Sequence, residues 1–263
     1  MQRTATEPAK DKGELAMDKE LVEKFIHLWA KYFNGSELPI TFCYADQCHG
    51  FELVEPAPQN QCFIGALSRI RKGASLCFEE KSIGCGGGKR YLGFTKQVEP
   101  NFEHFLSCGL PGQFEGLRYK KSPELVREAE KQLPSFEAPA RYLVSKRLDR
   151  LEESDSPQVI VFFAQPDVLA GLFFLANFDE ADVNGVFAPF ASGCASIVLY
   201  PYLENSSKNP RGVLGMFDIS ARPFVPGNIL TLAFPTNKFI RIVENMEESF
   251  LIGPFWEKVK KRL

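Results

Sequence analysis

The chain has 263 residues, a formal net charge of −2 and a hydrophobic fraction of 44%. This balance is ordinary for a globular protein with a sizeable core, and it lacks the basic surface that nucleic-acid binding requires. No apolar run reaches the length of a membrane span, and residues 1–19 are too polar for a secretory signal. We therefore expect a cytoplasmic protein with no nucleic-acid partner and no membrane partner.

Helical spacing of apolar residues, helix caps and glycine stops define the elements expected in the first half of the chain. They are helices over 18–33, 61–72, 102–107 and 122–133, and strands over 39–45 and 74–78. Residues 85–88 are expected to form a glycine turn. Residues 1–16 are expected to be a disordered leader, followed by a single domain over 17–263.

The second half of the chain is richer in expected strands. They cover 140–148, 158–164, 185–189, 197–202, 213–219 and 229–234, with helices over 166–178 and 236–247. Strands and helices do not alternate cleanly enough for a doubly wound sheet. The sequence therefore predicts an α+β fold, a single domain with a mixed or antiparallel sheet flanked by helices.

Cysteine is the most informative residue type, because there are seven of them and no pair has two-residue spacing. They are Cys43, Cys48, Cys62, Cys77, Cys85, Cys108 and Cys194. In a protein without export they are expected to be reduced thiols rather than a disulfide framework. A metal site assembled from Cys62, Cys85 and Cys194 is one interpretation of the pattern. The other is that these cysteines are small apolar side chains in the core.

Two further features suit anion binding. The N–H groups of Gly86, Gly87 and Gly88, next to Cys85, could turn inward to form an anion nest. This stretch matches neither the phosphate-binding loop nor the dinucleotide-binding pattern. Arg222 follows an expected strand, where a guanidinium group suits a carboxylate or another anion. A flexible glycine turn and an exposed loop arginine are the alternative interpretations.

Several short motifs, in their order and separation, resemble the uncharacterised family called domain of unknown function 169, an archaeal-type cysteine-rich family. They cover 61–73, 84–94, 193–201, 215–218, Arg222, 229–235 and 239–245. The resemblance spans about residues 20–250 and implies one domain. It also implies that Cys62, Cys85 and Cys194 are the family-type cysteines, that they lie close together, and that Arg222 is their polar partner. It implies no established activity.

The other four cysteines have no counterpart in the family pattern. They are Cys43, Cys48, Cys77 and Cys108. A cluster that needs a fourth sulfur would have to take it from this group.

Two functions of different classes follow from these features. The first is a cytoplasmic redox or metal-cofactor protein, in which Cys62, Cys85 and Cys194 bind an iron–sulfur cluster or another thiolate-bound metal. The second is a non-catalytic protein that holds a small anionic or carboxylate ligand in a Phe-rich pocket, against Arg222 and residues 86–88. Whether the protein is an enzyme and whether it forms a homo-oligomer stay open.

Overall fold

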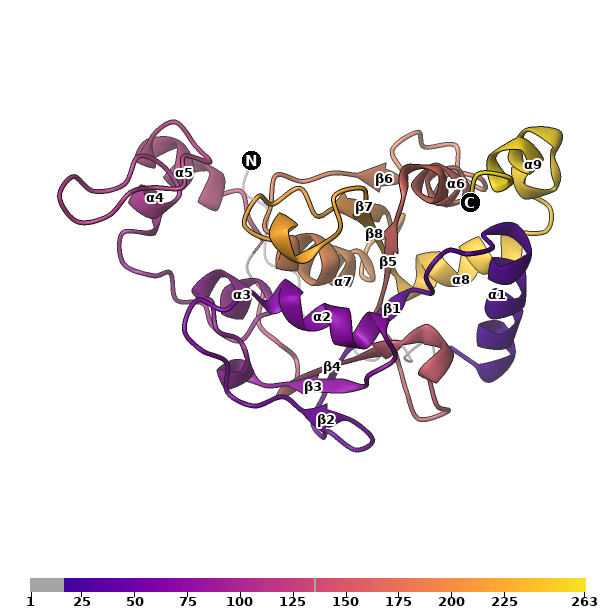
Figure 1. Cartoon of the computed structure of the whole chain (residues 1–263), viewed down its shortest axis with the longest axis horizontal. Coiled ribbons are helices and arrows are strands. Elements are labelled where there is room, and N and C mark those ends of the chain that lie inside the picture. The colour runs from indigo at the N-terminus through magenta and orange to yellow at the C-terminus, as the bar shows by residue number, and fades with distance from the viewer. Residues whose placement is uncertain (1–16, 135) are drawn as a thin grey trace.

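The computed structural model describes residues 17–134 and 136–263, and its centre is one mixed β-sheet (Figure 1). Within the described residues, the sheet contains eight strands in the order β2-β3-β4-β1-β5-β8-β7-β6. Neighbouring strands are antiparallel except for β2–β3 and β6–β7 at the two edges. The predicted α+β fold with a mixed sheet is confirmed. The expected leader over residues 1–16 lies outside the described residues.

The strands are short, and the longest have six residues. They are β1 (Ile40–Ala45), β2 (Glu52–Leu53), β3 (Leu76–Phe78), β4 (Tyr142–Arg147), β5 (Val159–Ala164), β6 (Val186–Phe187), β7 (Gly212–Gly215) and β8 (Leu230–Pro235). Strand β5 is buried along its whole length and separates two cores.

Helices cover both faces of the sheet, and α4 and α5 lie together on an arm at one side of it (Figure 1). The helices are α1 (Lys19–Tyr32), α2 (Phe63–Arg71), α3 (Gly86–Tyr91), α4 (Phe102–Phe105), α5 (Pro123–Glu130), α6 (Pro166–Ala176), α7 (Tyr200–Glu204), α8 (Thr236–Asn245) and α9 (Pro254–Lys260). A π-helix over Ala195–Leu199 leads directly into α7.

Alternation along β5 sends its side chains to the two faces of the sheet. Val159, Val161 and Phe163 enter the first core, which also contains side chains of α2 and of the π-helix. Ile160 and Phe162 enter the second core, together with side chains of α1, α6, α8 and α9. We call the two sides of the sheet the first face and the second face accordingly.

Most of the expected elements are present, and the exceptions have clear causes. The expected strand over 197–202 is wrong, because this stretch forms the π-helix and α7. The π-helix is buried all round, so its apolar run shows no helical period. The expected strand over 213–219 stops at Gly215, because Met216 adopts a left-handed conformation with φ of 67°. Strand β2 and helix α9 were not predicted.

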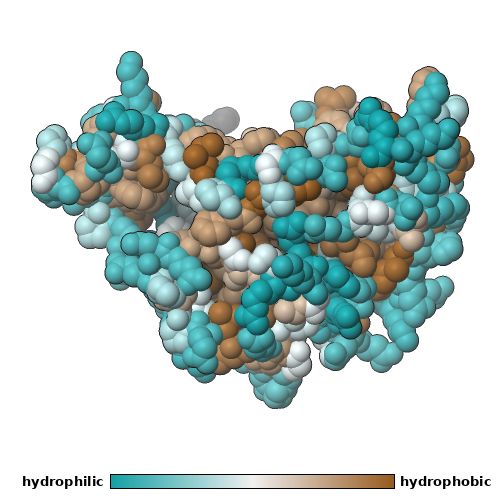
Figure 2. Space-filling view, viewed as in Figure 1, coloured by the Kyte–Doolittle hydropathy of each residue, from teal (hydrophilic) through white to brown (hydrophobic). Residues whose placement is uncertain are grey.

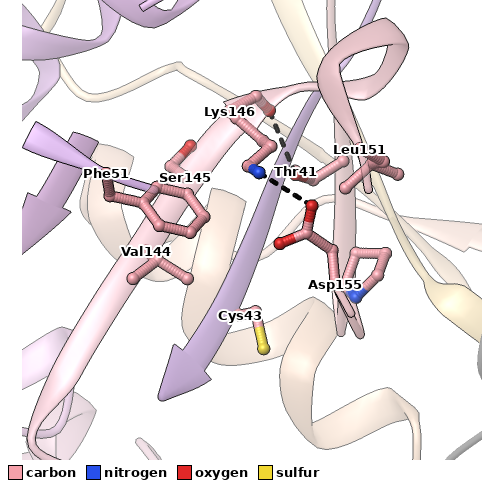
Figure 3. Close-up of a pocket in the computed structure, with 9 residues that line it drawn as sticks. Thr41, Cys43, Phe51, Val144, Ser145, Lys146, Leu151 and Asp155 are labelled. Carbon is pink, nitrogen blue, oxygen red and sulfur yellow. Dashed lines mark hydrogen bonds and ion pairs between the residues drawn. The ribbon is translucent and has the colours of Figure 1, made fainter. Parts of the chain in front are cut away.

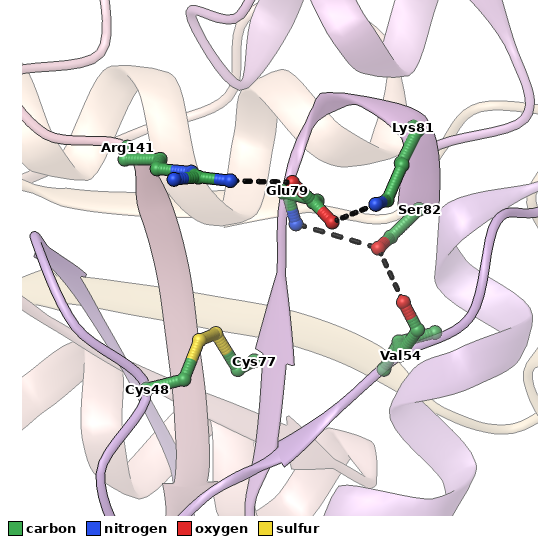
Figure 4. Close-up of a disulfide and its surroundings, with 7 residues drawn as sticks. All are labelled: Cys48, Val54, Cys77, Glu79, Lys81, Ser82 and Arg141. Carbon is green, nitrogen blue, oxygen red and sulfur yellow. Dashed lines mark hydrogen bonds and ion pairs between the residues drawn. A yellow bond between two sulfur atoms is a disulfide. The ribbon is translucent and has the colours of Figure 1, made fainter.

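The expectation that all seven cysteines are reduced thiols is wrong for one pair. Cys48 and Cys77 form a disulfide, with 5.8 Å between their Cα atoms (Figure 4). Cys48 lies in the loop after β1, and Cys77 lies on β3, so residues 29 positions apart meet across the edge of the sheet. Sequence spacing does not reveal such a pair, because the contact depends on how the strands are ordered.

Candidate functional site: a partly buried group of three cysteines

Cys62, Cys85 and Cys194, which we call the cysteine site, all stand at the start of a helical segment. Cys62 is the N-cap of α2, Cys85 is the N-cap of α3, and Cys194 immediately precedes the π-helix. The first N–H groups of a helix have no partner within the helix, so a side chain at the cap can accept from them. Cys85 Sγ accepts from such a group, and the N–H groups of Ile64 and Gly65 act on Cys62. Cys194 lies within the first turn of its segment, where Ser192 has the cap role.

Gly88 lies beside the sulfur atoms of Cys85 and Cys194. Its N–H donates to Cys85 Sγ over 3.2 Å. A Cβ atom on Gly88 would lie 2.8 Å from Cys85 Sγ and 3.9 Å from Cys194 Sγ, so the two sulfurs are separated by no more than those two distances added together. A side chain at residue 88 would also lie 2.8 Å from Ile83, so glycine is required beside the two sulfurs.

Cys62 lies close enough to Cys85 and Cys194 for the charges of these cysteines to affect one another's pKa values. Burial raises the pKa of the Cys62 thiol above its ordinary value, the N–H groups of Ile64 and Gly65 lower it, and the charges of Cys85 and Asp218 raise it further. Burial also raises the pKa of Cys194 well above its ordinary value, with contributions from Cys85, Cys62 and Asp218. Charges act in this way over short distances, so the three thiols share one region.

Asp218 is the residue of this region that the sequence did not single out. Its Oδ2 accepts from the N–H of Gly193 at 3.0 Å, and its Oδ1 accepts from the N–H and the hydroxyl of Ser220 at 2.9 and 2.7 Å. The carboxylate thus holds the backbone next to Cys194. Residues 215–218 belong to the family-like motifs, but one acidic residue in a loop gives no chemical signal by itself.

Ser196 of the π-helix also holds the backbone at Gly193, next to Cys194. The hydroxyl of Ser196 donates to the carbonyl of Gly193 at 2.9 Å and accepts from the N–H of Met216 at 3.4 Å. A side chain on Gly215 would collide with Ser196, so glycine is required there. A π-helix is rare and frequently occurs at functional sites. Here it ties Cys194 to the segment that carries Asp218.

The glycine stretch has a different structure from the one expected. Gly86, Gly87 and Gly88 form the first turn of α3 rather than a flexible turn. The N–H of Gly88 is directed at Cys85 Sγ. The stretch therefore contributes to the cysteine site, whereas its role as an anion nest stays a prediction.

Arg222 lies, like Asp218, in the segment between β7 and β8. Its guanidinium donates to the carbonyls of Ile229, Gly227 and Pro226 at 2.5, 2.9 and 3.2 Å. It also lines a surface cavity of about 350 Å³, together with Pro166, Leu169, Met216, Phe217, Ile219, Gly227, Asn228 and Leu230. Among the described residues, those that line this cavity do not include the α3 glycines.

Hydrophobic side chains are exposed close to this region. Phe217 and Phe224 are about half exposed, and the ring of Phe224 lies against Gly65 on the first turns of α2. Figure 2 shows brown hydrophobic areas interrupting the hydrophilic surface of this view. Phe217 is the one phenylalanine among the described residues that line the cavity, and the Phe-rich ligand pocket stays a prediction.

Within residues 17–134 and 136–263, no group of three or more His, Cys, Asp or Glu side chains is arranged to hold a metal ion. In the same part of the chain, every helix is too short or too polar to cross a membrane.

Comparisons with known proteins identify one family. The family model of domain of unknown function 169, described as an uncharacterised ArCR family, matches residues 36–245. The matched region contains the three residues of the cysteine site as well as Asp218 and Arg222. No curated protein and no solved structure matches the chain.

Proposed function

The chain belongs to the uncharacterised family domain of unknown function 169, and we propose that it is a cytoplasmic redox or metal-cofactor protein that works through the cysteine site. The observation that carries this proposal is that three cysteines from three separate segments lie in one partly buried region. Cysteines that serve only as core side chains have no need to gather in this way.

The three sulfurs are not arranged to hold a metal ion as they stand, so loading requires them to come closer together around a thiolate-bound cofactor, for which an iron–sulfur cluster is the preferred form. Such clusters are held by cysteine thiolates, and N–H donors to sulfur tune them. The N–H of Gly88 supplies such a donor to Cys85, and those of Ile64 and Gly65 supply donors to Cys62. Three thiolates also leave a position for a further ligand, which a reactive site requires.

Proton release would accompany loading of the site. The pKa values of Cys62 and Cys194 are raised, mainly by burial, so both residues are neutral thiols at pH 7. A metal binds the thiolate, so each ligating cysteine must lose its proton. Cofactor affinity should therefore increase as the pH rises from about 6.5 to about 8.5.

The test is reconstitution with ferrous iron and sulfide after anaerobic purification. We expect bound iron, bound sulfide and charge-transfer absorption in the visible range. Cys62→Ser, Cys85→Ser and Cys194→Ser should each lose most of this signal. Cys108→Ser is the matched control, because Cys108 is exposed. A colourless wild-type protein, or equal loading of all four variants, would contradict the proposal.

A second candidate function rests on the cavity beside Arg222. A small carboxylate could bind there between the apolar wall, which includes Phe217, and the guanidinium. Three carbonyls already accept from this guanidinium, which is why we rank this function second. Calorimetric titration with short-chain carboxylates tests it. Binding that Arg222→Gln abolishes would support it, and no heat from any carboxylate would reject it.

A further inference from the structure

Three of the remaining cysteines lie on the opposite side of the sheet from the cysteine site. Cys43 on β1 and Cys77 on β3 both pair with Val144 of β4, one from each side. Directly paired residues point to the same face, so both side chains belong to the second face. Cys48 reaches this face from the loop after β1 and joins Cys77 in the disulfide (Figure 4).

The same face carries a buried lysine. Lys146 is two residues beyond Val144 on β4 and is only 3% exposed. Its ammonium group lies 2.7 Å from Asp155 Oδ2 and 4.4 Å from the centre of the Phe51 ring (Figure 3). Beside it is a cavity of about 10 Å³ that is lined in part by Thr41 and Cys43, with room for about one water. Phe51 therefore lies against the ammonium group of Lys146 and lines the same small pocket.

The disulfide anchors the segment that provides this cover. The N–H of Phe51 donates to the carbonyl of Cys48 at 3.0 Å, and the disulfide fixes Cys48 to β3. On the other side of Phe51, β2 has only two residues, and both are exposed at the edge of the sheet. The backbone of Val54 is held by Cys77 and Ser82 (Figure 4). Without the disulfide, residues 46–51 would be held mainly at their two ends, by the pairing of Ala45 with Tyr142 and by β2.

We propose that the Cys48–Cys77 disulfide is a redox-modification site, and that its reduction by a dithiol releases residues 46–51 and uncovers Lys146. This site lies outside the cysteine site and does not depend on the proposed function. Local opening becomes easier when a cross-link is removed, because the opened segment regains conformational freedom.

The reaction is a two-electron thiol–disulfide exchange. One thiolate of the dithiol attacks Cys48 Sγ, which is half-buried, whereas Cys77 is fully buried. The bond between the two protein sulfurs breaks, a mixed disulfide forms, and Cys77 leaves as a thiolate. The second thiol of the dithiol then closes its own disulfide and releases Cys48. The dithiol is oxidised, and its two protons end on Cys48 and Cys77.

The test compares two buried lysines in the full chain. Lys146 and Lys238 are 3% and 1% exposed, and each has a carboxylate oxygen 2.7 Å away, from Asp155 and Glu180. Lys238 lies on α8 and is not covered by residues 46–51. Acylation by acetic anhydride, quantified by peptide mass spectrometry, should rise at least fivefold at Lys146 after treatment with dithiothreitol. It should stay unchanged at Lys238.

Two outcomes would overturn the proposal. One is unchanged acylation of Lys146 after reduction. The other is an equal rise at both lysines, which would mean general unfolding. The double variant Cys48→Ser/Cys77→Ser should reproduce the selective rise without any dithiol, which separates this effect from loss of a cofactor at the cysteine site. If the double variant does not fold, the wild-type comparison before and after reduction still decides.

Discussion

The cysteines on the two faces of the sheet lie in different backbone surroundings. At the cysteine site, Cys62 and Cys85 are helix N-caps, and Cys194 immediately precedes the π-helix. On the second face, Cys43 and Cys77 lie within strands that pair with β4. Cys77 is paired with another cysteine. The two groups of cysteines thus differ in the backbone around them, with helix starts on the first face and paired strands on the second.

The largest expected effect concerns the second face. Removing the disulfide with Cys48→Ser/Cys77→Ser should lower the free energy of unfolding by about 3–4 kcal/mol, from the entropy of closing a loop of this length. Urea unfolding of the wild-type protein and the double variant measures this difference. A dithiol should destabilise the wild-type protein and leave the double variant unchanged. Equal sensitivity of both proteins to the dithiol would show that the disulfide is not the stabilising element.

The next effect concerns the first face. Gly88→Ala would place a Cβ atom 2.8 Å from Cys85 Sγ and from Ile83, and should cost about 1–3 kcal/mol as well as cofactor loading. Gly87→Ala is a matched control in the same helical turn, because its Cβ would lie 3.8 Å from the Tyr91 ring. This control should be neutral or slightly stabilising, since alanine favours a helix. Equal behaviour of the two variants in thermal unfolding and iron loading would contradict the site geometry.

The sequence predicted the fold class and most elements because their signals are local. Helix α1 has Asp18 as its cap and a regular apolar stripe, and α5 begins with Ser122 and Pro123. Such features act within a few residues, so they can be recognised without the fold. Residues 195–204 had no comparable signal, because a fully buried helical segment and a buried strand have the same apolar composition.

The candidate site was only partly predictable for a related reason. The motif resemblance pointed to Cys62, Cys85 and Cys194. Asp218 was missed because its role depends on a hydrogen bond to Gly193, which is distant in the sequence. The disulfide partner of Cys48 was missed because β3 and the loop after β1 meet only in the folded sheet.

A smaller effect is expected from Asp218→Asn. The negative charge of Asp218 raises the pKa values of Cys62 and Cys194, so its removal should lower both. More thiolate would then be present at pH 7.5, and alkylation of both cysteines by iodoacetamide should become about two- to threefold faster. Loss of charge-assisted hydrogen bonds to Gly193 and Ser220 should cost about 1–2 kcal/mol. Asp46→Asn, at an exposed position, is the control. Slower alkylation in Asp218→Asn would contradict the assigned electrostatics.

The smallest effect is the pH dependence of stability. The folded state raises the pKa of Cys194, so this thiol contributes stability at pH values below its unfolded pKa of about 8.5 and loses it at higher pH. Between about pH 8.5 and about pH 9.5, the unfolding free energy of cofactor-free protein should fall by about 1 kcal/mol more than that of Cys194→Ala. Chemical denaturation at both pH values measures the difference. Parallel pH profiles would show that Cys194 titrates normally in the folded state.

Site-resolved alkylation of all seven cysteines, before and after iron–sulfide reconstitution, tests the contrast between the two faces most directly. We expect reconstitution to protect Cys62, Cys85 and Cys194 together, while exposed Cys108 reacts at an unchanged rate. Cys48 and Cys77 should resist alkylation in both samples until a dithiol is added. Unchanged reactivity at the cysteine site after reconstitution, or alkylation of Cys48 and Cys77 without a reductant, would contradict this account.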